Sequence, residues 1–341
     1  MKHAVFVKPG LIEWRETPAP QLQGPREALV RPLVVGRCDL DVAYARGLLP
    51  MPSGAPIGHE IIGEVIEVGE DAGVKPGDRV FVPAQISCGA CRNCRRGLTG
   101  RCESVPFAAS YGMGREGDYG GGLADLVRVP FARAMLTPLP GGGDPVALIG
   151  AADMGADAWR AVGPYLAHHP EARVLVLGGM PPVIGLYSAA LAVALGASVI
   201  HYVDADETRR AVAESYGATA HPATPSGSYD LIVIALPTRA ALAGAFALAA
   251  PGATIVSVTP AIDGPLEVAT AELYHRGVTW TIGRPDCRHG HDGIMNAWAT
   301  CGFCADRVPT RVVDWQDAPD AWTGDDLYVV ATRTAENPND L

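Results

Sequence analysis

Apolar and polar residues follow two different patterns along the chain. From residue 1 to about residue 145, short apolar runs such as EALVRPLVVG, EIIGEVIEVG and GDRVFVP are separated by Gly and Pro, and helical periodicity is scarce. Runs of this kind predict short strands joined by turns. We therefore expect the first part of the chain to be a β-rich domain with irregular connections.

From about residue 146, continuous apolar runs alternate with Ala-rich or charged segments of helical length. The runs are RVLVLGG, SVIHYVD, YDLIVIAL and ATIVSVTP. Apolar strands that alternate with helices predict a doubly wound parallel sheet, covered on both faces. Val183 to Ile200 runs for eighteen residues without a charge. We interpret it as a buried helix and strand of this sheet rather than as a membrane span.

These patterns predict an α/β protein with two domains, for which a length of 341 residues is sufficient. The β-rich domain covers residues 1–145 and the parallel-sheet domain covers residues 146–285. The last segment, 286–341, is expected to return to the first domain.

Composition narrows the classes of function. Hydrophobic residues make up 48% of the chain and charged residues 19%, which is typical of an ordered globular protein. The formal net charge of −10 argues against a nucleic acid partner. The N-terminal run MKHAVFVKPGLIEW lacks the apolar core of a secretory signal, so we expect a cytoplasmic protein with no membrane partner. In that reducing compartment, clustered cysteines hold metal more often than they form disulfides.

Four of the eight cysteines form a C-x2-C-x2-C-x7-C cluster within fifteen residues. They are Cys88, Cys91, Cys94 and Cys102. Four thiolates suit one closed tetrahedral zinc site, which has no open position for chemistry. We expect a structural zinc whose negative charge is partly offset by Arg92, Arg95, Arg96 and Arg101. Disulfides, free buried thiols or a basic binding patch made by these arginines are the alternatives.

Several motifs occur in one order along the chain: GRCDLD around Cys38, GHEIIGEVIEVG from Gly58, KPGDRV from Lys75 and GGGLADLVRVP from Gly120. Together with the four-cysteine cluster and the nucleotide-binding half, they make the chain resemble the zinc-containing medium-chain dehydrogenase/reductase family, of the alcohol dehydrogenase type. The resemblance covers nearly the whole length. It implies a GroES-like catalytic domain, a Rossmann domain, and an active site in the cleft between them.

The resemblance also implies a catalytic zinc, and therefore two Zn²⁺ ions per chain. Cys38 and His59 match the first two ligands of the family, and Asp153 lies where the third is expected. Glu60 matches a carboxylate beside the metal. Three protein ligands leave one position for water or substrate. The alternatives are a small core residue for Cys38 and a helix N-cap for Asp153.

Leu40 departs from the family pattern. Two residues after the first ligand, the family has a Ser or Thr that passes the substrate proton towards solvent, and leucine cannot donate or accept a proton. We favour a replacement relay through Asp39, Tyr44 or Glu60 by way of water. Direct transfer to bulk solvent and loss of alcohol oxidation are the alternatives.

The predicted nucleotide-binding turn reads GGMPPVIG over residues 178–185. It is longer than G-x-G-x-x-G, with Met180 and two prolines where the middle glycine would fall. Gly178 or Gly179 allows the tight turn and Gly185 serves close helix packing. A turn that binds no nucleotide is the alternative.

Asp204 lies nineteen residues beyond Gly185, where an acid accepts hydrogen bonds from the ribose hydroxyls and repels a 2′-phosphate. This position favours NAD as the cofactor. Arg209 matches a family arginine beside the adenine, and with Arg210 it keeps NADP as the alternative.

A second C-x2-C is formed by Cys301 and Cys304, with Cys287, His289 and His291 nearby in sequence. A half-motif is weak evidence for a metal site. We expect these to be packed or surface residues.

The predicted function is that of a zinc-dependent alcohol dehydrogenase, which transfers a hydride between a small secondary alcohol or polyol and NAD. The alternatives are an NADPH-dependent zinc reductase of aldehydes or ketones, and a non-catalytic nicotinamide-binding relative. The expected partners are a small-molecule alcohol or carbonyl substrate and, as the family implies, further copies of the chain in a homodimer or homotetramer.

Overall fold

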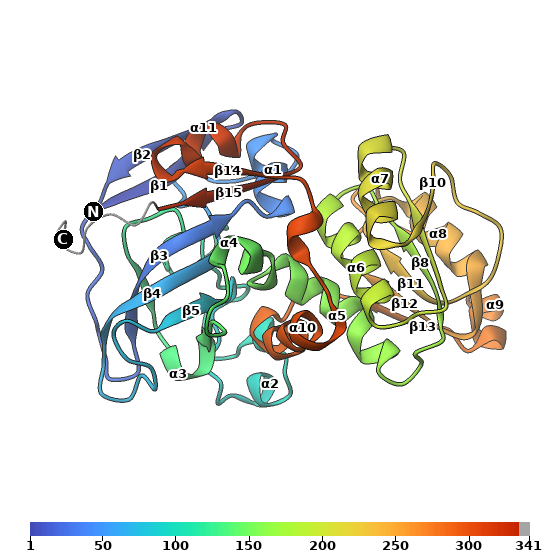
Figure 1. The fold of residues 1–341 in the computed structure, drawn as a ribbon, viewed down its shortest axis with the longest axis horizontal. Coiled ribbons are helices and arrows are strands. Elements are labelled where there is room, and N and C mark those ends of the chain that lie inside the picture. The colour runs from blue at the N-terminus through green and yellow to red at the C-terminus, as the bar shows by residue number, and fades with distance from the viewer. Residues whose placement is uncertain (334–341) are drawn as a thin grey trace. The chain divides into compact units, whose positions relative to one another are not determined.

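The computed structural model describes residues 1–333, which form two compact units (Figure 1). Unit 1 comprises Met1–Asp153, Asp286–His291 and the described residues from Pro309 onward. Unit 2 comprises Met154–Pro285 and Asp292–Val308. Residues 146–153 thus lie in unit 1, and the predicted last segment is shared between the units. Residues 334–341 of that segment lie outside the described part of the chain.

Unit 1 is built around a seven-stranded sheet with the order β14-β15-β3-β4-β5-β7, in which β6 also pairs with β3. Only the β14–β15 pair is parallel. Its strands are β3 (Ala28–Gly36), β4 (Glu60–Val68), β5 (Arg79–Val82), β6 (Val127–Val129), β7 (Thr137–Pro138), β14 (Thr310–Asp314) and β15 (Tyr328–Thr332). A separate hairpin pairs β1 (Lys2–Lys8) with β2 (Leu11–Glu16). Strand β15 from the end of the chain lies beside β3 from its beginning (Figure 1).

Helices in unit 1 are short. They are α1 (Asp39–Ala45), α2 (Arg92–Arg95), α3 (Ala132–Met135), α4 (Pro145–Leu148) and α11 (Ala318–Trp322), with 3₁₀ turns η1 (Thr99–Arg101), η2 (Ile149–Ala151) and η4 (Trp315–Asp317). The core lies between the sheet and these connections, with Val35, Ile61, Val80 and Trp322 fully buried. The β-rich character predicted from the short apolar runs is confirmed.

Unit 2 contains a six-stranded sheet with the order β10-β9-β8-β11-β12-β13, in which every pair is parallel. The strands are β8 (Arg173–Leu177), β9 (Val199–Val203), β10 (Thr219–His221), β11 (Tyr229–Ile234), β12 (Ala249–Ser257) and β13 (Thr279–Ile282). Counted within the unit, this is the order 3-2-1-4-5-6 of the dinucleotide-binding Rossmann fold. The strand order reverses between β8 and β11, where such folds bind ligands at the carboxyl ends of the strands.

Helices alternate with these strands, as the sequence pattern predicts. They are α5 (Met154–Leu166), α6 (Pro182–Ala194), α7 (Glu207–Tyr216), α8 (Arg239–Leu248), α9 (Thr270–Arg276) and α10 (Cys287–Cys301), followed by η3 (Ala305–Arg307). The uncharged stretch Val183 to Ile200 forms most of α6 and the start of β9. Among the described residues, no helix has both the length and the apolar character needed to cross a bilayer.

Helix α10 belongs to both units. Its first residues, up to His291, are part of unit 1, and the rest is part of unit 2. In unit 2 the ring of Phe303 meets the ring of Tyr187 edge to face, with 5.8 Å between centroids. The Tyr216 hydroxyl donates to the Cys304 carbonyl at 3.1 Å. These contacts hold residues 292–308 in unit 2, whereas residues 286–291 and the residues from Pro309 onward belong to unit 1.

Candidate metal centres and cofactor site

Two paired strand ends bring Cys38 and His59 together. Gly36 at the end of β3 pairs with Glu60 at the start of β4. Cys38 follows this pair and His59 precedes it, so both lie at the same end of the sheet. Asp153 arrives from η2, which packs against β3 and β4. The predicted set therefore meets, although its members come from three segments of the chain.

The ligand atoms of Cys38, His59 and Asp153 all lie within 4.8 Å of one another, and all three residues are buried. The His59 Nε2 atom lies 3.5 Å from Asp153 Oδ2. Neither ring nitrogen of His59 has a hydrogen-bond partner among the described residues. A buried imidazole without partners is costly unless something else satisfies it. These donors fit a zinc ion, which binds thiolate, imidazole and carboxylate.

Negative charge surrounds this centre. Asp39, Asp41, Glu60 and Asp153 are all less than 5% exposed. Burial raises the pKa of the Cys38 thiol well above its usual value, and the carboxylates of Asp153 and Glu60 raise it further. A bound divalent cation would reverse that shift, since it stabilises the thiolate directly. A cation bound by Cys38, His59 and Asp153 would therefore balance the negative charge of these buried groups.

The side chain of Asp41 lies beside the His59 ring. Asp41 Oδ1 lies 3.5 Å from His59 Nδ1, on the side of the ring away from Asp153. The other oxygen, Asp41 Oδ2, accepts from the Cys38 backbone N–H at 3.2 Å. A carboxylate beside the second nitrogen of a ligating histidine orients the ring and raises its basicity. Sequence reasoning missed Asp41, whose signal is its place three residues after Cys38 at the start of α1.

Glu60 is buried and directed towards β15. Its Oε2 accepts from the Tyr328 hydroxyl at 2.6 Å. Gly36 makes room for this pair, because a side chain at that position would overlap both the carboxylate and the hydroxyl. The predicted carboxylate beside the metal ligands is therefore held by a tyrosine from the last strand.

The missing hydroxyl at Leu40 has candidate replacements nearby in the sequence. Asp39 and Tyr44 are both buried, whereas Leu40 is partly exposed. Burial raises the pKa of Tyr44, and the positive charge of Arg115 opposes that rise. Tyr44 thus remains protonated at neutral pH and can donate a hydrogen bond. A relay through Asp39, Tyr44 or Glu60 stays a prediction.

The second centre is the four-cysteine lobe. The sulfur atoms of the four predicted cysteines also lie within 4.8 Å of one another. Cys91 caps α2 by accepting from the Cys94 N–H at 3.4 Å. Cys88 Sγ accepts from the N–H groups of Ala90 and Cys91, at 3.4 and 3.3 Å. The backbone of the lobe therefore points its amides at the sulfurs, as a thiolate cluster requires.

The pKa values of two thiols in the lobe shift in opposite directions. Burial alone would raise the pKa of Cys88, but hydrogen bonds from the Ser104 hydroxyl and from nearby backbone N–H groups outweigh it and lower the pKa to about 6. Burial and the neighbouring Cys91 instead raise the pKa of Cys94. Cys88 thus loses its proton readily, whereas Cys94 keeps its proton. Zinc binding would convert both to thiolates.

Two of the arginines in the lobe bond oxygen atoms: Arg101 bonds a carboxylate and Arg95 bonds a backbone carbonyl. Arg101 Nη1 donates to Asp286 Oδ2 at 2.7 Å, and the Gly100 N–H donates to Asp286 Oδ1 at 2.8 Å. Arg95 bonds the Ala90 carbonyl within the lobe. His289 packs over Gly97, where a side chain would meet the imidazole ring. The lobe is thereby docked onto the first residues of α10.

From the sequence we predicted Cys287 to be a packed or surface residue without a functional role. It is fully buried, and its Sγ lies 2.8 Å from Asp153 Oδ1. His291, one turn further along α10, bonds the Ala152 carbonyl at 2.9 Å through Nε2. Within the described chain, Cys301 and Cys304 join no group of three potential metal ligands. In the sequence, Cys287, His289 and His291 lie near one another, but nothing in their spacing relates them to Cys38, His59 and Asp153.

Three glycines of the turn in unit 2 lie where a side chain would be strained or crowded. Gly179 has φ +148°, which disfavours any side chain. A Cβ on Gly178 would come within 2.5 Å of the Tyr202 hydroxyl, and one on Gly185 within 3.3 Å of the Ala235 methyl group. The prolines at 181 and 182 remove two N–H donors from the start of α6. The turn is therefore tight, with fewer amides to offer a pyrophosphate than the usual motif.

Asp204 lies directly after β9, as predicted, but its carboxylate is fully engaged. Arg209 donates to both oxygens, at 2.8 and 2.7 Å. The Tyr202 hydroxyl and the Asp206 N–H each donate at 2.9 Å. A carboxylate has about four acceptor positions, and here all four have a donor. Arg209, which we predicted to lie beside the adenine, thus neutralises Asp204, the carboxylate expected to accept hydrogen bonds from the ribose hydroxyls.

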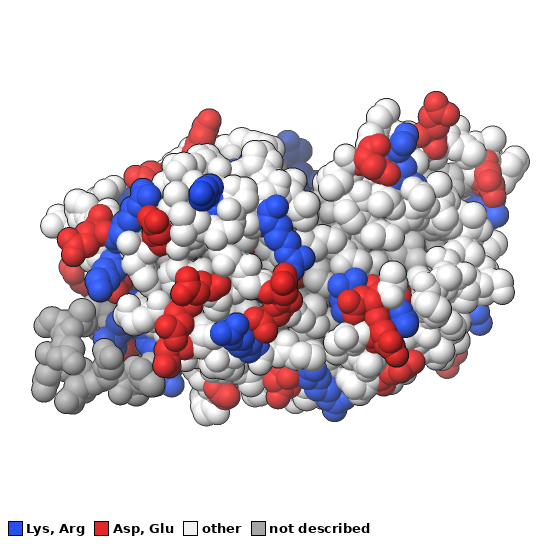
Figure 2. Space-filling view, turned by 90° about the horizontal axis from the view of Figure 1, so that it is seen from above, with Lys and Arg blue, Asp and Glu red and all other residues white. Residues whose placement is uncertain are grey.

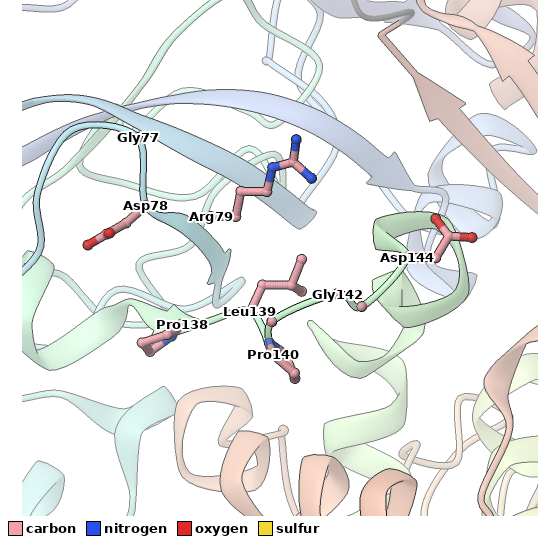
Figure 3. Close-up of a pocket in the computed structure, with 10 residues that line it drawn as sticks. Gly77, Asp78, Arg79, Pro138, Leu139, Pro140, Gly142 and Asp144 are labelled. Atoms are coloured by element: carbon pink, nitrogen blue, oxygen red, sulfur yellow. The ribbon is translucent and has the colours of Figure 1, made fainter.

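A pocket of about 560 Å³ in unit 1 has none of the candidate metal ligands in its lining. Figure 3 shows its lining residues. It is lined by residues 77–79 and 138–144. Asp144 accepts from the Val146 N–H at 3.0 Å and so caps α4, and Asp78 accepts from the Lys75 N–H at 2.9 Å. Since both carboxylates already serve the local backbone, we assign no ligand to this pocket.

The face of the molecule seen in Figure 2 carries both signs of charge in small, neighbouring groups. Its acidic and basic side chains are interspersed, and no broad basic surface covers this face. The excess of negative charge in the composition is thus spread over small groups there instead of forming one large field.

Comparison with known proteins identifies the family. The model of the alcohol dehydrogenase GroES-like domain matches residues 24–141. The medium chain reductase/dehydrogenase ucsI of Acremonium sp. is 33% identical over 224 residues, which cover 64% of this chain and 74% of that relative. This chain belongs to the zinc-containing medium-chain dehydrogenase/reductase family.

Other members of this family match as well. The glutathione-independent formaldehyde dehydrogenase of Pseudomonas aeruginosa (strain LESB58) is 33% identical over 225 residues, which cover 62% of this chain. The chain spans only 56% of that relative's length. The solved structure of alcohol dehydrogenase TADH from Thermus sp. ATN1 has a TM-score of 0.88 and 28% identity, and the match covers 98% of this chain and 100% of that one. The predicted family and fold class are confirmed.

Proposed function

We propose that this protein is a zinc- and nicotinamide-dependent dehydrogenase that acts on a small alcohol, with a secondary alcohol or polyol as the favoured substrate class. The observation that carries the proposal is the buried group of Cys38, His59 and Asp153. Three ligands, all buried and within 4.8 Å of one another, leave one position of a tetrahedral zinc ion for a substrate oxygen. A purely structural site would have filled that position.

When bound, the zinc would supply a Lewis acid for the substrate oxygen, and the dinucleotide would supply the hydride acceptor. The residues of the chain provide position and environment. Cys38, His59 and Asp153 would hold the ion, and Asp41 would orient the His59 ring. Tyr328 holds Glu60 in place beside them. Burial of these groups keeps bulk water from competing for the open position.

Proton transfer to solvent must bypass Leu40. We propose Tyr44 as the relay, because its hydroxyl is protonated at neutral pH and lies on the same short helix as the residues that flank Cys38. A Tyr44→Phe variant should lower kcat for alcohol oxidation by about 10²-fold if this hydroxyl is the proton carrier. An unchanged kcat in that variant would exclude Tyr44 and leave Asp39 or Glu60 by way of water, or direct transfer to bulk solvent.

For the cofactor we propose NAD, with weak discrimination against NADP. Asp204 lies where an acid of the family accepts hydrogen bonds from the ribose hydroxyls. Arg209 neutralises the charge of this carboxylate, and this weakens the repulsion of a 2′-phosphate. An Arg209→Ala variant frees two acceptor positions on Asp204 and should raise the preference for NAD. Dissociation constants of NAD and NADP for both forms, measured by calorimetry, test this. A wild type that strongly prefers NADP would favour the reductase alternative.

The proposed activity is tested by following NADH formation with a panel of primary alcohols, secondary alcohols and polyols. The wild type should turn over at least one class, and Cys38→Ser should turn over none. The competing candidate is a non-catalytic nicotinamide-binding relative, which Leu40 and the two prolines of the glycine turn favour. One zinc per chain and no turnover of any alcohol would support that candidate.

We also propose a homodimer or homotetramer in the cytoplasm. Strand β13 is the last strand of its sheet, and all four of its residues are exposed, including Trp280 and Ile282. An exposed apolar edge strand is suited to pair with a second copy. No two of the described cysteines are joined in a disulfide, as expected in a reducing compartment. Light scattering on the purified protein gives the number of copies.

A further inference from the structure

The carboxylate of Asp153 has two oxygens in different surroundings. Oδ2 lies 3.5 Å from His59 Nε2, within the group of potential ligands. Oδ1 lies 2.8 Å from the sulfur of Cys287, which does not belong to that group. In this contact the Cys287 thiol donates and the carboxylate oxygen accepts.

Cys287 is itself held firmly. Its backbone N–H donates to Gln85 Oε1 at 3.1 Å, and both residues are buried. On one side, Asp286 is bonded to the four-cysteine lobe through Arg101 and the Gly100 N–H. On the other side, His291 Nδ1 lies 2.9 Å from the Thr137 hydroxyl. The thiol therefore reaches Asp153 from a fixed segment within unit 1.

A carboxylate with two free oxygens can rotate or bind a metal ion through both. If both oxygens of Asp153 approached the ion, they would fill the position that a substrate oxygen needs. A thiol that donates to Oδ1 opposes binding through both oxygens, because it stabilises the orientation of the carboxylate in which only Oδ2 faces His59. Resting on the proposed function, we propose that Cys287 is a positioning residue, whose S–H group keeps Asp153 a single-oxygen ligand and the fourth metal position open.

An infrared measurement tests the hydrogen bond without removing Cys287. With both centres loaded, five of the eight cysteines would be metal thiolates without an S–H bond, which leaves Cys287, Cys301 and Cys304. The double variant Cys301→Ala/Cys304→Ala thus isolates one S–H stretching band. We expect this band at lower frequency than that of an unbonded thiol. A band at the unbonded position, or no band because Cys287 is itself a metal-bound thiolate, would overturn the proposal.

Cobalt reports the geometry of the ligands. Co²⁺ is exchanged into the catalytic centre while zinc remains in the lobe, and its visible spectrum is recorded for wild type, Cys287→Ala and Cys287→Ser. We expect Cys287→Ala to bind Co²⁺ about 10- to 100-fold more weakly, as for other losses of a group that orients a ligand. Its visible bands should lose intensity as the geometry departs from tetrahedral. Cys287→Ser keeps a donor of similar size and should restore most of both properties.

Cys301→Ala is the matched control, because Cys301 is a partly exposed cysteine of the same helix and should leave affinity and spectrum unchanged. A wild-type affinity and spectrum in Cys287→Ala would overturn this inference alone, even if that variant were less stable to heat. A wild-type chain that takes up no Co²⁺ at Cys38 would instead overturn the proposed function, and this inference with it.

Discussion

The two candidate metal centres of unit 1 are built in opposite ways. The four-cysteine lobe takes all its ligands from fifteen consecutive residues and satisfies its sulfurs with amides of the same loop. The set of Cys38, His59 and Asp153, proposed to be catalytic, takes one candidate ligand each from next to β3, β4 and η2, and side chains from α1, α10 and β15 pack beside it. A local site stabilises its own loop, whereas a dispersed site depends on the whole unit and can keep a position open for substrate.

The largest difference between the centres should appear in turnover. His59→Ala should lower kcat/KM by about 10³-fold or more, because a Lewis acid contributes several kcal/mol and about 1.4 kcal/mol corresponds to a factor of ten. Steady-state NADH formation measures the effect. His168→Ala, at an exposed histidine of unit 2, is the control and should behave as wild type. Substantial turnover by His59→Ala would remove the catalytic role from this centre.

The lobe should instead determine stability. Cys94→Ser should release the zinc of the lobe and lower the free energy of unfolding by about 4 kcal/mol, which is roughly 8–16 °C in Tm. Turnover by the protein that remains folded should change little. Calorimetric unfolding and an activity assay on the same sample separate the two effects, with Cys301→Ser as control. A Tm equal to that of the wild type would mean that the lobe needs no metal.

Supporting groups should matter more at the dispersed centre. Asp41→Asn keeps the shape of the side chain but removes the charge beside His59 Nδ1. Metal affinity at this centre should fall about 10- to 100-fold, as measured by competition with a chelator. The lobe in the same molecule is the internal control, and its zinc should be retained. Equal affinities in variant and wild type would show that His59 needs no orienting carboxylate.

The smallest effect is expected where the lobe docks onto α10. Asp286→Asn weakens the contacts with Arg101 and the Gly100 N–H. Because the Arg101 side chain is 36% exposed, we expect a loss of only about 0.5–1 kcal/mol in thermal unfolding, with both zinc ions retained. A fall in Tm as large as that of Cys94→Ser would mean that docking, rather than zinc, holds the lobe in shape.

The same contrast explains what could be predicted from sequence. The spacing of Cys88, Cys91, Cys94 and Cys102 carries its own geometry, so the lobe needs no fold to be recognised. Cys38, His59 and Asp153 were found only through the family resemblance, because nothing in their spacing relates them. The alternation of apolar strands and helices was enough to predict the parallel sheet of unit 2.

Side-chain contacts across the fold could not be predicted. Cys287 meets Asp153 from a distant part of the chain, and Tyr328 meets Glu60 from the last strand. Asp204 was placed correctly at the end of β9, but the sequence did not show that Arg209 would occupy both of its oxygens. Such pairings depend on rotamers and packing, which leave no periodic signal.

We expect one chain to carry two different zinc sites, one closed and one open. Zinc content, measured by mass spectrometry of the metal in wild type and in a Cys38→Ser/His59→Ala double variant, tests it most directly. We predict two zinc ions per wild-type chain and one in the variant, with the four-cysteine lobe still loaded. One zinc ion in both proteins would contradict it.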